Sequence, residues 1–462
     1  MKRIVAVGPV LLIALVLPAT AQQETGITPR ILQELEGSFK SDEHFRSVQN
    51  ALAQFDGNKI APNWEKMISI DDHFSNRLKD QKITDQKSSG RCWMFSSLNT
   101  LRPVAVKKLN CKEFEFSQNY LFFYDKLEKA NMFLEAVIKL RDRPVSDRTV
   151  EFLLRAPVQD GGNWLGFIEL VKKYGVVPKD ITPETYSSSN SGTVNHVLGL
   201  KLKQYAMKLR DSKNAGRLDG LKVQALKDVY KILGMNFGIP PREFKWRYET
   251  KNDSLTEFTT YTPREFYREV VDQALDDYCP FYSIPTLPFG KKYEIDLDKA
   301  VYDQPNMYFV NVPLETLKEL AKKALLDNQP VWFGCDVGQE SMGDNGLMAP
   351  EIRDYSALYG MDFDLSRKEL FETYSSIPTH NMVFTGIDIV DGKIQKWLVE
   401  NSWGEKAGKK GYSSMTDAWF DKYVQVLAVH KKYVPKDVLA LFDTKADILP
   451  PWDPMFHLLN GE

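Results

Sequence analysis

Cys92 stands where its local sequence would place a catalytic nucleophile. It follows the turn-forming residues Ser89 and Gly90 and opens an apolar segment that predicts a helix. The N-terminus of a helix carries free N–H groups and a partial positive charge, which stabilise a thiolate over a thiol. Because the thiolate is the attacking form of cysteine, this position favours covalent chemistry on a carbonyl group.

Gln86, a short distance upstream, adds electrostatic support to such a nucleophile. Its side-chain amide and the Cys92 backbone N–H could both donate hydrogen bonds to the oxyanion that develops on an attacked carbonyl. The run Gln86–Phe95 therefore supplies a nucleophile and half of the electrostatic support for its reaction.

The groups that would complete this chemistry lie far downstream. His380 enters a short apolar, strand-like run, and Asn401 directly follows the strand-like residues Lys396–Glu400. An imidazole accepts the thiol proton and returns it to the leaving amine, while a neutral amide oxygen fixes the tautomer and orientation of the ring. Trp403 could shield that hydrogen bond from water. The order Gln, Cys, His, Asn is the order of the papain-like proteases.

The chain resembles the bleomycin hydrolase and aminopeptidase C branch of the papain-like cysteine peptidases over roughly residues 40–456. In the general papain signature His and Asn follow the Cys by roughly 130–150 residues, whereas His380 follows Cys92 at about twice that interval. The surplus predicts a long insertion, and this branch is similar in carrying one. The motifs behind the resemblance are Gln86–Phe95, Asp160–Trp164, Lys173–Lys179, Thr262–Tyr267, Val331–Gly338, Val399–Glu405 and Pro450–Met455.

The resemblance implies an α+β, papain-like fold with a helical lobe, a β-barrel-like lobe, a long helical insertion and a C-terminal arm in the cleft. The catalytic Cys would lie in the helical lobe, and the His and Asn in the β-rich lobe. The expected division is a signal peptide over 1–21, an N-terminal extension over 22–75, the helical lobe over 76–180, the mainly helical insertion over 181–325, the β-rich lobe over 326–445 and the arm over 446–462.

The helix that begins near Cys92 is expected to bury Phe95, Leu98 and Leu101 on one side. Pro103 should kink or end this helix unless local packing compensates for the lost hydrogen bond. Short strands are expected further on, over Val331–Cys335, Met382–Val390, Lys396–Glu400 and Tyr423–Val429.

A substrate wall is expected at Gly161 and Gly162, where an extended peptide backbone could approach and pair as an extra strand. The alternative is a simple turn, and the resemblance favours the substrate wall, which Asn163 would help to line. Asn381 stands where relatives commonly have Ala, so it could add a polar contact on the leaving-group side of the substrate. Trp403 would lie beside the same site.

The resemblance also gives the C-terminus a function. In this branch the C-terminal arm lies along the cleft, and its terminal carboxylate, here that of Glu462, can pair with the α-ammonium of the substrate. That contact converts an endopeptidase cleft into an aminopeptidase. The arm would extend from Trp452 to Glu462, and the alternative is a frayed tail. The ending Asn460–Glu462 does not match that of the family, which leaves strict exopeptidase action open.

The N-terminus predicts export. Lys2 and Arg3 precede an apolar run from Ile4 to Leu17, and an A-x-A-like cleavage site ends at Ala21. This apolar run is shorter than the ~20 residues of a spanning helix, although an uncleaved anchor is the alternative. The mature chain is therefore expected to be periplasmic or secreted and free of the membrane.

Composition fits a large globular enzyme. Hydrophobic residues make up 43% and charged residues 26% of the 462 residues, and 60 Lys and Arg against 62 Asp and Glu give no expectation of nucleic-acid binding. No residue pair has metal-ligand spacing and no Gly-rich phosphate loop is present, so no metal or organic cofactor is expected. The expected partners are peptide substrates and, as the resemblance implies, further copies of the chain in a ring-shaped homohexamer.

The remaining cysteines argue against a disulfide framework. If Cys92 stays a free thiol, Cys111, Cys279 and Cys335 form an odd set that cannot all pair within one chain. Cys111 and Cys279 could form one bridge, or both could be buried as small apolar residues. Cys335 closes an apolar strand and is expected in the core.

The sequence therefore predicts an exported papain-like cysteine aminopeptidase. Cys92 would attack the peptide carbonyl, His380 would act as base and then acid, Asn401 would orient His380, and Gln86 would stabilise the oxyanion. One alternative is that the same residues perform endopeptidase cleavage or acyl transfer. A second is a non-catalytic scaffold or binding protein, although such a protein has no need of all four residues.

Overall fold

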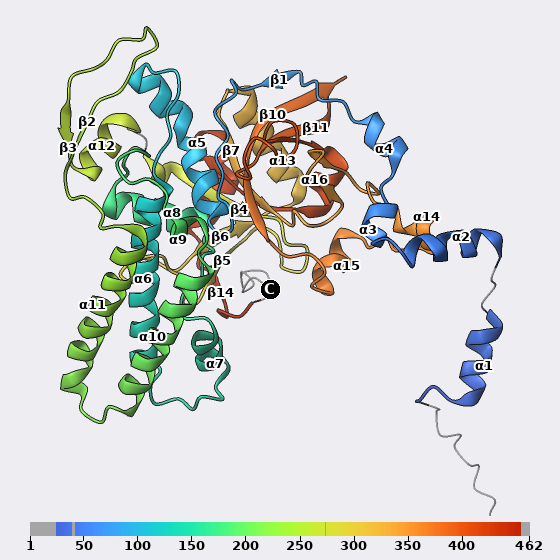
Figure 1. The fold of residues 1–462 in the computed structure, drawn as a ribbon, viewed down its shortest axis with the longest axis horizontal. Coiled ribbons are helices and arrows are strands. Elements are labelled where there is room, and N and C mark those ends of the chain that lie inside the picture. The colour runs from blue at the N-terminus through green and yellow to red at the C-terminus, as the bar shows by residue number, and fades with distance from the viewer. Residues whose placement is uncertain (1–24, 39–41, 273, 454–462) are drawn as a thin grey trace, which may run out of the picture. The chain divides into compact units, whose positions relative to one another are not determined.

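The computed structural model describes residues 25–38, 42–272 and 274–453 (Figure 1). The chain divides into two compact units, Met1–Ile60 and Ala61–Glu462. The expected signal peptide over 1–21 and the terminal carboxylate of Glu462 lie outside the described residues. The division places residues 61–75, which we expected in an N-terminal extension, with the second unit.

The first unit is helical in its described part. It contains α1 (Pro29–Ser38), α2 (Glu43–Leu52) and α3 (Gly57–Ile60), whose described residues include no buried side chain. Asp42 caps α2, because its carboxylate accepts a hydrogen bond of 2.7 Å from the Phe45 backbone N–H.

Long helices dominate one part of the second unit. In α10 the buried residues Val194, Leu198, Leu202 and Leu209 recur at helical spacing, and they form an apolar stripe that packs against α6 and α11 (Figure 1). The helices before residue 275 are α4 (Trp64–Ser69), α5 (Cys92–Leu109), α6 (Gln118–Lys139), α7 (Arg148–Arg155), α8 (Trp164–Tyr174), α9 (Tyr186–Ser189), α10 (Gly192–Asp211), η1 (Ala215–Arg217), α11 (Leu218–Phe237) and α12 (Pro263–Val270).

A large mixed sheet forms the other part of this unit. Its strand order is β14-β5-β6-β4-β13-β7-β10-β11-β12-β9-β8, with β1 paired to β10. These strands are β1 (Asn76–Arg77), β4 (Tyr278–Tyr282), β5 (Lys291–Ile295), β6 (Tyr308–Asn311), β7 (Val331–Cys335), β8 (Ser341–Met342), β9 (Leu347–Met348), β10 (His380–Val390), β11 (Lys393–Glu400), β12 (Tyr412–Thr416), β13 (Val424–His430) and β14 (Asp447–Leu449).

The remaining elements are short, apart from one helix. Strands β2 (Phe244–Trp246) and β3 (Thr259–Tyr261) form a separate antiparallel pair. Helix α13 (Leu314–Leu326) packs on the sheet, against β10 and β13. The other helical elements after residue 274 are η2 (Leu275–Asp277), α14 (Tyr355–Tyr359), α15 (Arg367–Glu372), α16 (Asp417–Tyr423), η3 (Lys431–Tyr433), α17 (Lys436–Leu439) and η4 (Ala440–Asp443).

The strands β10 and β11 bring two distant sequence segments together. They are antiparallel neighbours, and their register pairs Val383 with Glu400. On its other side β10 pairs with β7, where His380 lies opposite Cys335. The chain therefore leaves β11 at Asn401 next to the end of β10 that carries His380.

The predicted strands and the predicted helix are confirmed, and two points were left open or not predicted by the sequence. Pro103 does not end α5, which continues to Leu109, so packing compensates as the sequence left open. The segment 181–325 contains the long helices α10 and α11, but it also contributes β4, β5 and β6 to the main sheet. A short apolar run such as Tyr278–Tyr282 fits a strand as well as a buried helical turn, so the sequence pattern alone does not predict these strands.

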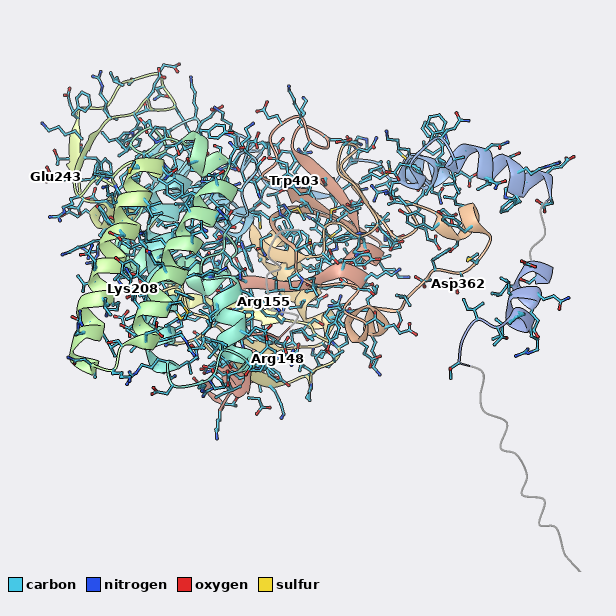
Figure 2. The ribbon with its side chains drawn as sticks, turned by 60° about the horizontal axis from the view of Figure 1, so that its bottom comes forward. Arg148, Arg155, Lys208, Glu243, Asp362 and Trp403 are labelled. Carbon is cyan, nitrogen blue, oxygen red and sulfur yellow. The ribbon has the colours of Figure 1, made fainter. Side chains whose placement is uncertain are left out.

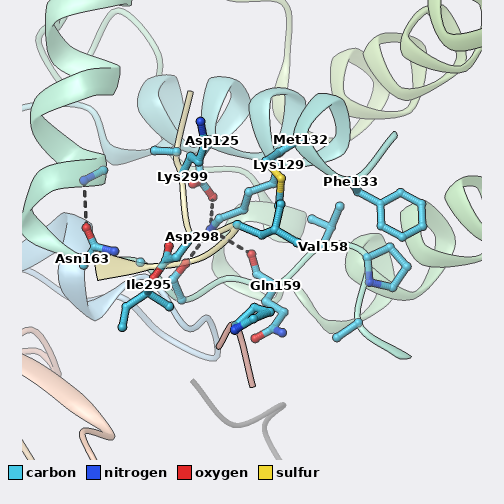
Figure 3. Close-up of a pocket in the computed structure, with 18 of the residues that line it drawn as sticks. Asp125, Lys129, Met132, Phe133, Val158, Gln159, Asn163, Ile295, Asp298 and Lys299 are labelled. Atoms are coloured by element: carbon cyan, nitrogen blue, oxygen red, sulfur yellow. Dashed lines mark hydrogen bonds and ion pairs between the residues drawn. The ribbon is translucent and has the colours of Figure 1, made fainter. Parts of the chain in front are cut away.

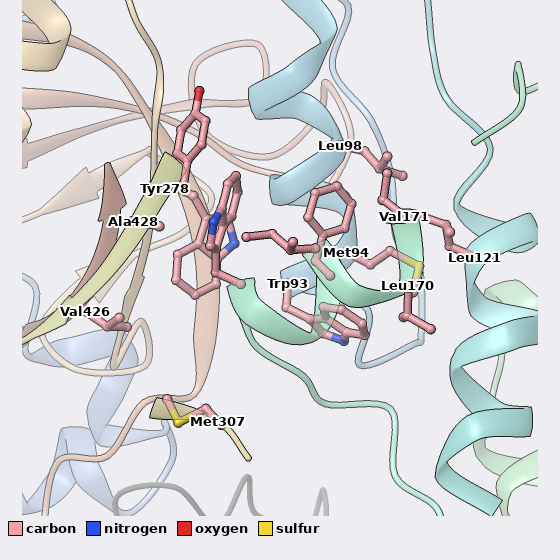
Figure 4. Close-up of a cluster of buried hydrophobic side chains, with 14 of the residues drawn as sticks. Trp93, Met94, Leu98, Leu121, Leu170, Val171, Tyr278, Met307, Val426 and Ala428 are labelled. Atoms are coloured by element: carbon pink, nitrogen blue, oxygen red, sulfur yellow. The ribbon is translucent and has the colours of Figure 1, made fainter. Parts of the chain in front are cut away.

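A continuous hydrophobic core joins the helices to the sheet (Figure 4). Trp93 and Met94 of α5 lie between Leu170 of α8 on one side and strand residues, including Tyr278 and Val426, on the other. Phe95, Leu98 and Leu101 are buried as predicted.

All four cysteines are buried free thiols. Cys335 lies in the core, as we expected. The bridge between Cys111 and Cys279 is not formed, so both behave as small buried side chains. Across the described residues, no helix has the length and apolar character needed to cross a membrane.

Candidate active site

Cys92 lies at the first position of α5, in the wall of a cavity of about 550 Å³. The chain reaches this position through Gly90, and the apolar residues that follow Cys92 hold α5 in the core. The other residues that line the cavity come from four segments: Ser88, Ser89, Gly90 and Trp93; Val158 to Gly162; Ser191, Gly192 and Asn195; and Thr379 and Asn381.

His380 and Asn401 meet as the register of β10 and β11 requires. The Nε2 atom of His380 lies 2.9 Å from the side-chain oxygen of Asn401, and both residues are buried. The Trp403 ring stacks on the His380 ring with centroids 4.7 Å apart and remains 37% exposed, so it lies on the solvent side of the pair (Figure 2). Helix α5 packs on β10, which brings the Cys92 helix to the strand of His380.

Gln86 is buried and held in a fixed orientation. Its amide nitrogen donates to the Ser89 carbonyl at 2.8 Å, and its amide oxygen accepts from the Ser402 hydroxyl at 2.6 Å. The Gln86 backbone N–H donates to the Ser402 carbonyl at 2.8 Å. A primary amide carries two N–H donors, and the bond to Ser89 uses one of them. The loop before Cys92 is thus tied to the residue that follows Asn401.

Burial controls the ionisation of the cysteine and histidine. It raises the pKa of the Cys92 thiol to about 11, although backbone hydrogen bonds act in the opposite direction. It also lowers the pKa of His380 to about 4, although the hydrogen bond to Asn401 opposes this shift. Burial of the thiol therefore opposes the thiolate that we expect the helix N-terminus to favour. Burial therefore disfavours a thiolate on Cys92 alone and an imidazolium on His380 alone.

Asn381 and the two glycines lie beside the nucleophile. The Cys92 thiol is 3.8 Å from the side-chain oxygen of Asn381, which accepts its hydrogen bond. Both Gly161 and Gly162 line the cavity. A Cβ atom on Gly162 would lie 2.5 Å from the Trp93 ring, so only glycine fits there without a shift of the wall.

Asn163 has a structural contact that sequence reasoning missed. It is the N-cap of α8, and its side-chain oxygen accepts from the Gly166 backbone N–H at 2.9 Å. Asn163 lines a second cavity, on the other side of the glycine wall, rather than the cavity of Cys92.

Asp160 is a further residue that sequence reasoning did not single out. Its carboxylate accepts hydrogen bonds from the Gly90 backbone N–H at 2.9 Å, from Lys126 at 2.6 Å, from Asn195 at 2.7 Å and from Ser191. Burial acts to raise the pKa of Asp160, but Lys126 and these donors hold it well below its usual range. In the sequence, the only indication that Asp160 belongs to the site is its position directly before Gly161 and Gly162.

Among the described residues, no group of three or more His, Cys, Asp or Glu side chains is arranged to hold a metal ion.

The fold and this site define the class of protein. A cysteine that opens a buried helix faces a sheet, and on that sheet an asparagine orients a histidine; this is the architecture of a papain-like cysteine peptidase. A profile of the Peptidase C1-like family matches residues 26–456. The chain belongs to the Peptidase C1-like family.

Named relatives agree with this assignment. The chain is 36% identical over 444 residues to an Aminopeptidase C of Streptococcus thermophilus, which covers 94% of this chain and 100% of that protein. It is 38% identical to the Bleomycin hydrolase of Homo sapiens, over 81% of this chain and 85% of that protein. The crystal structure of pepw from Lactobacillus rhamnosis HN001 superposes with a TM-score of 0.90 at 38% identity, over 93% of this chain and 99% of that one.

Proposed function

We propose that the protein is a cysteine aminopeptidase that removes residues from the N-terminus of peptides. The observation that carries this proposal is the 2.9 Å contact between His380 and Asn401 beneath Trp403, on the strand against which the Cys92 helix packs. Relatives named Aminopeptidase C support the peptide substrate and the mode of cleavage.

The contact between His380 and Asn401 supports one direction for the proposed proton transfer. Because Nε2 of His380 faces the Asn401 oxygen, this nitrogen carries the hydrogen and Nδ1 is the base. Nδ1 takes the thiol proton as Sγ of Cys92 attacks the peptide carbonyl. The resulting oxyanion accepts from the Cys92 backbone N–H and from the second amide hydrogen of Gln86.

The second half of the reaction reverses these roles. The imidazolium gives its proton to the departing amine, so the peptide C–N bond breaks and a thioester remains on Cys92. Neutral His380 then removes a proton from water, which attacks the thioester and releases the free amino acid. Asn381 and the wall at Gly161 and Gly162 position the substrate on either side of the scissile bond.

The choice of aminopeptidase over endopeptidase rests on the C-terminal arm. In its described part, Pro451 is buried and the Trp452 ring centroid lies 5.1 Å from the guanidinium carbon of Arg148. The arm is therefore fixed before residue 454, and we propose that its continuation to Glu462 limits the cleft to a short substrate N-terminus. The proposal also includes export through residues 1–21 and assembly as a homohexamer, which rest on the basic and apolar N-terminus and on the family resemblance.

The test compares fluorogenic leucine amides that carry a free or an acetylated α-amine. Mature protein and its Cys92→Ala variant are assayed under reducing conditions. We expect cleavage of the free-amine substrate alone, and none by the variant. Cleavage of both substrates would indicate an open endopeptidase cleft. Equal rates in the variant would overturn the mechanism and favour a non-catalytic scaffold.

A further inference from the structure

A second cavity, of about 160 Å³, lies behind the substrate wall (Figure 3). Trp93, Val158, Gln159, Gly161 and Gly162 line both this cavity and the cavity of Cys92. The two cavities are therefore neighbours that share the glycine wall.

The second cavity is apolar over most of its lining but contains charged groups. Its apolar side chains include Met132 and Phe133 of α6 and Ile295 at the end of β5. Asp125, Lys129 and Asp298 also face it (Figure 3). An apolar wall with one or two charged groups is the usual composition of a small-molecule subsite.

The charge of Lys129 is already balanced. Its ammonium group lies 2.8 Å from the Asp125 carboxylate and donates to the carbonyls of Gln159 at 3.1 Å and Gly161 at 2.5 Å. The other lysine of the lining, Lys299, donates to loop carbonyls, those of Tyr302 at 3.2 Å and Gln304 at 2.9 Å.

Asp298 is different. Within the described part of the chain, its side-chain carboxylate has no hydrogen-bond or ion-pair partner, although its backbone is fixed by bonds to Ile295 and Met307. Burial raises the pKa of Asp298 to about 6, while Lys129 acts in the opposite direction. A carboxylate in such surroundings is stabilised by any cation that enters the cavity.

We propose that this cavity binds an aliphatic ammonium group of the peptide substrate, with Asp298 as the counter-charge and the apolar wall against the carbon chain. The inference rests on the proposed action on peptides. The ammonium has two sources in a peptide: the free α-amine and a lysine side chain. In either case Asp298 determines specificity without taking part in bond cleavage.

The experiment measures binding, so that it does not depend on turnover. The Cys92→Ala protein is titrated in a calorimeter with leucinamide, acetyl-leucinamide, lysinamide and Nα-acetyl-lysinamide. The same titrations are made with Asp298→Asn added. This substitution keeps the shape of the side chain and removes only its charge.

We expect Asp298→Asn to weaken binding about tenfold or more for the probes that carry the recognised ammonium. A loss confined to leucinamide and lysinamide identifies the α-amine, and a loss confined to the two lysine probes identifies the side chain. An equal change for all four probes, no change, or no binding of any probe would overturn the proposal. Failure of the proposed function would show instead as absence of hydrolysis by the wild-type protein.

Glu169 provides the matched control. It lies on α8 near Asp298, but its carboxylate accepts from the Val301 backbone N–H and does not line the cavity. Glu169→Gln removes the same unit of charge from the neighbourhood. We expect it to leave the binding of all four probes within about twofold, and a loss equal to that of Asp298→Asn would show that the effect is one of general charge.

Discussion

At the scale of single residues, the site holds two groups that resist ionisation separately and assist it together. The buried surroundings that keep the Cys92 thiol and the His380 imidazole neutral also strengthen the attraction between a thiolate and an imidazolium. A proton that moves from Sγ to the ring creates both charges at once. In the proposed mechanism the pair exchanges one proton internally, and only a second proton, on His380, removes the base.

Because protonation of His380 removes the base, we expect activity to be lost at acid pH. Because the pKa of His380 lies at about 4, kcat/KM for a leucine substrate should be lost as pH falls through that value and recover above it. The Asn401 hydrogen bond acts to raise this pKa, so Asn401→Ala should move the limit to lower pH while reducing the plateau. A pH–rate profile of both proteins measures this. A limit near the ordinary histidine value, or one that rises in the variant, would contradict it.

Gly162 gives a steric prediction at the same scale. Gly162→Ala places a methyl group 2.5 Å from the Trp93 ring, which is itself fully buried. We expect a loss of about 1–3 kcal/mol in unfolding free energy and a lower kcat/KM from the displaced wall. Urea denaturation and peptide assays measure the two effects. Gly199→Ala is the control, because a Cβ there meets no atom within 4 Å and the residue does not line the Cys92 cavity.

At the scale of elements, a buried ion pair joins the nucleophile helix to the strand that precedes Asn401. Arg102 of α5 and Glu400 of β11 are 2.7 Å apart and only 2% and 4% exposed. Arg102 also donates to the Lys82 carbonyl at 2.5 Å. The pair therefore sets the position of α5 relative to the end of β11, from which Asn401 reaches His380.

Breaking this pair should be costly because it leaves a buried charge alone. We expect Arg102→Met to lower the unfolding free energy by about 3–5 kcal/mol. Adding Glu400→Gln should recover part of this loss, since the remaining partner is then neutral. Urea denaturation of the single and double variants measures the difference. A double variant no more stable than Arg102→Met would show that the orphaned charge is not the cause.

The elements also show how far sequence reasoning reaches. The strands Val331–Cys335 and Met382–Val390 were predictable because each is a β-branched or aromatic run with clear ends. The group of Gln86, Cys92, His380 and Asn401 was predictable because each residue lies in its own short motif. Asp160 and Asp298 were not, because their importance depends on partners: Asp160 gathers donors from α6 and α10, and Asp298 lacks any described partner. Such pairings exist only after the chain has folded.

At the scale of the whole molecule, the main buried core of the second unit runs from the helices into the sheet. The helical insertion is thus part of the same cooperative structure as the cleft. The C-terminal arm rejoins this structure through β14, which pairs with β5, and through Trp452 beside Arg148. Pro451 of the arm therefore lies in the lining of the second cavity.

This arrangement predicts the effect of shortening the chain after Asp453. Pro451 and Trp452 remain in place, so the fold and the hydrolysis of a free-amine leucine substrate should persist. Cleavage of the acetylated substrate should appear, because the segment proposed to close the cleft is gone. Comparing the two substrates on full-length and shortened protein measures this. An acetylated substrate that stays intact would show that another part of the chain excludes it.

The Asp160 carboxylate has a consequence for how the molecule could be controlled. It binds the Gly90 N–H, two residues before the nucleophile, and at the same time Ser191 and Asn195, where α10 begins. The start of α10 and the approach to Cys92 therefore share one anchor. We expect a molecule that binds the far ends of α10 and α11 and shifts these helices, such as an antibody fragment, to change turnover without touching the substrate.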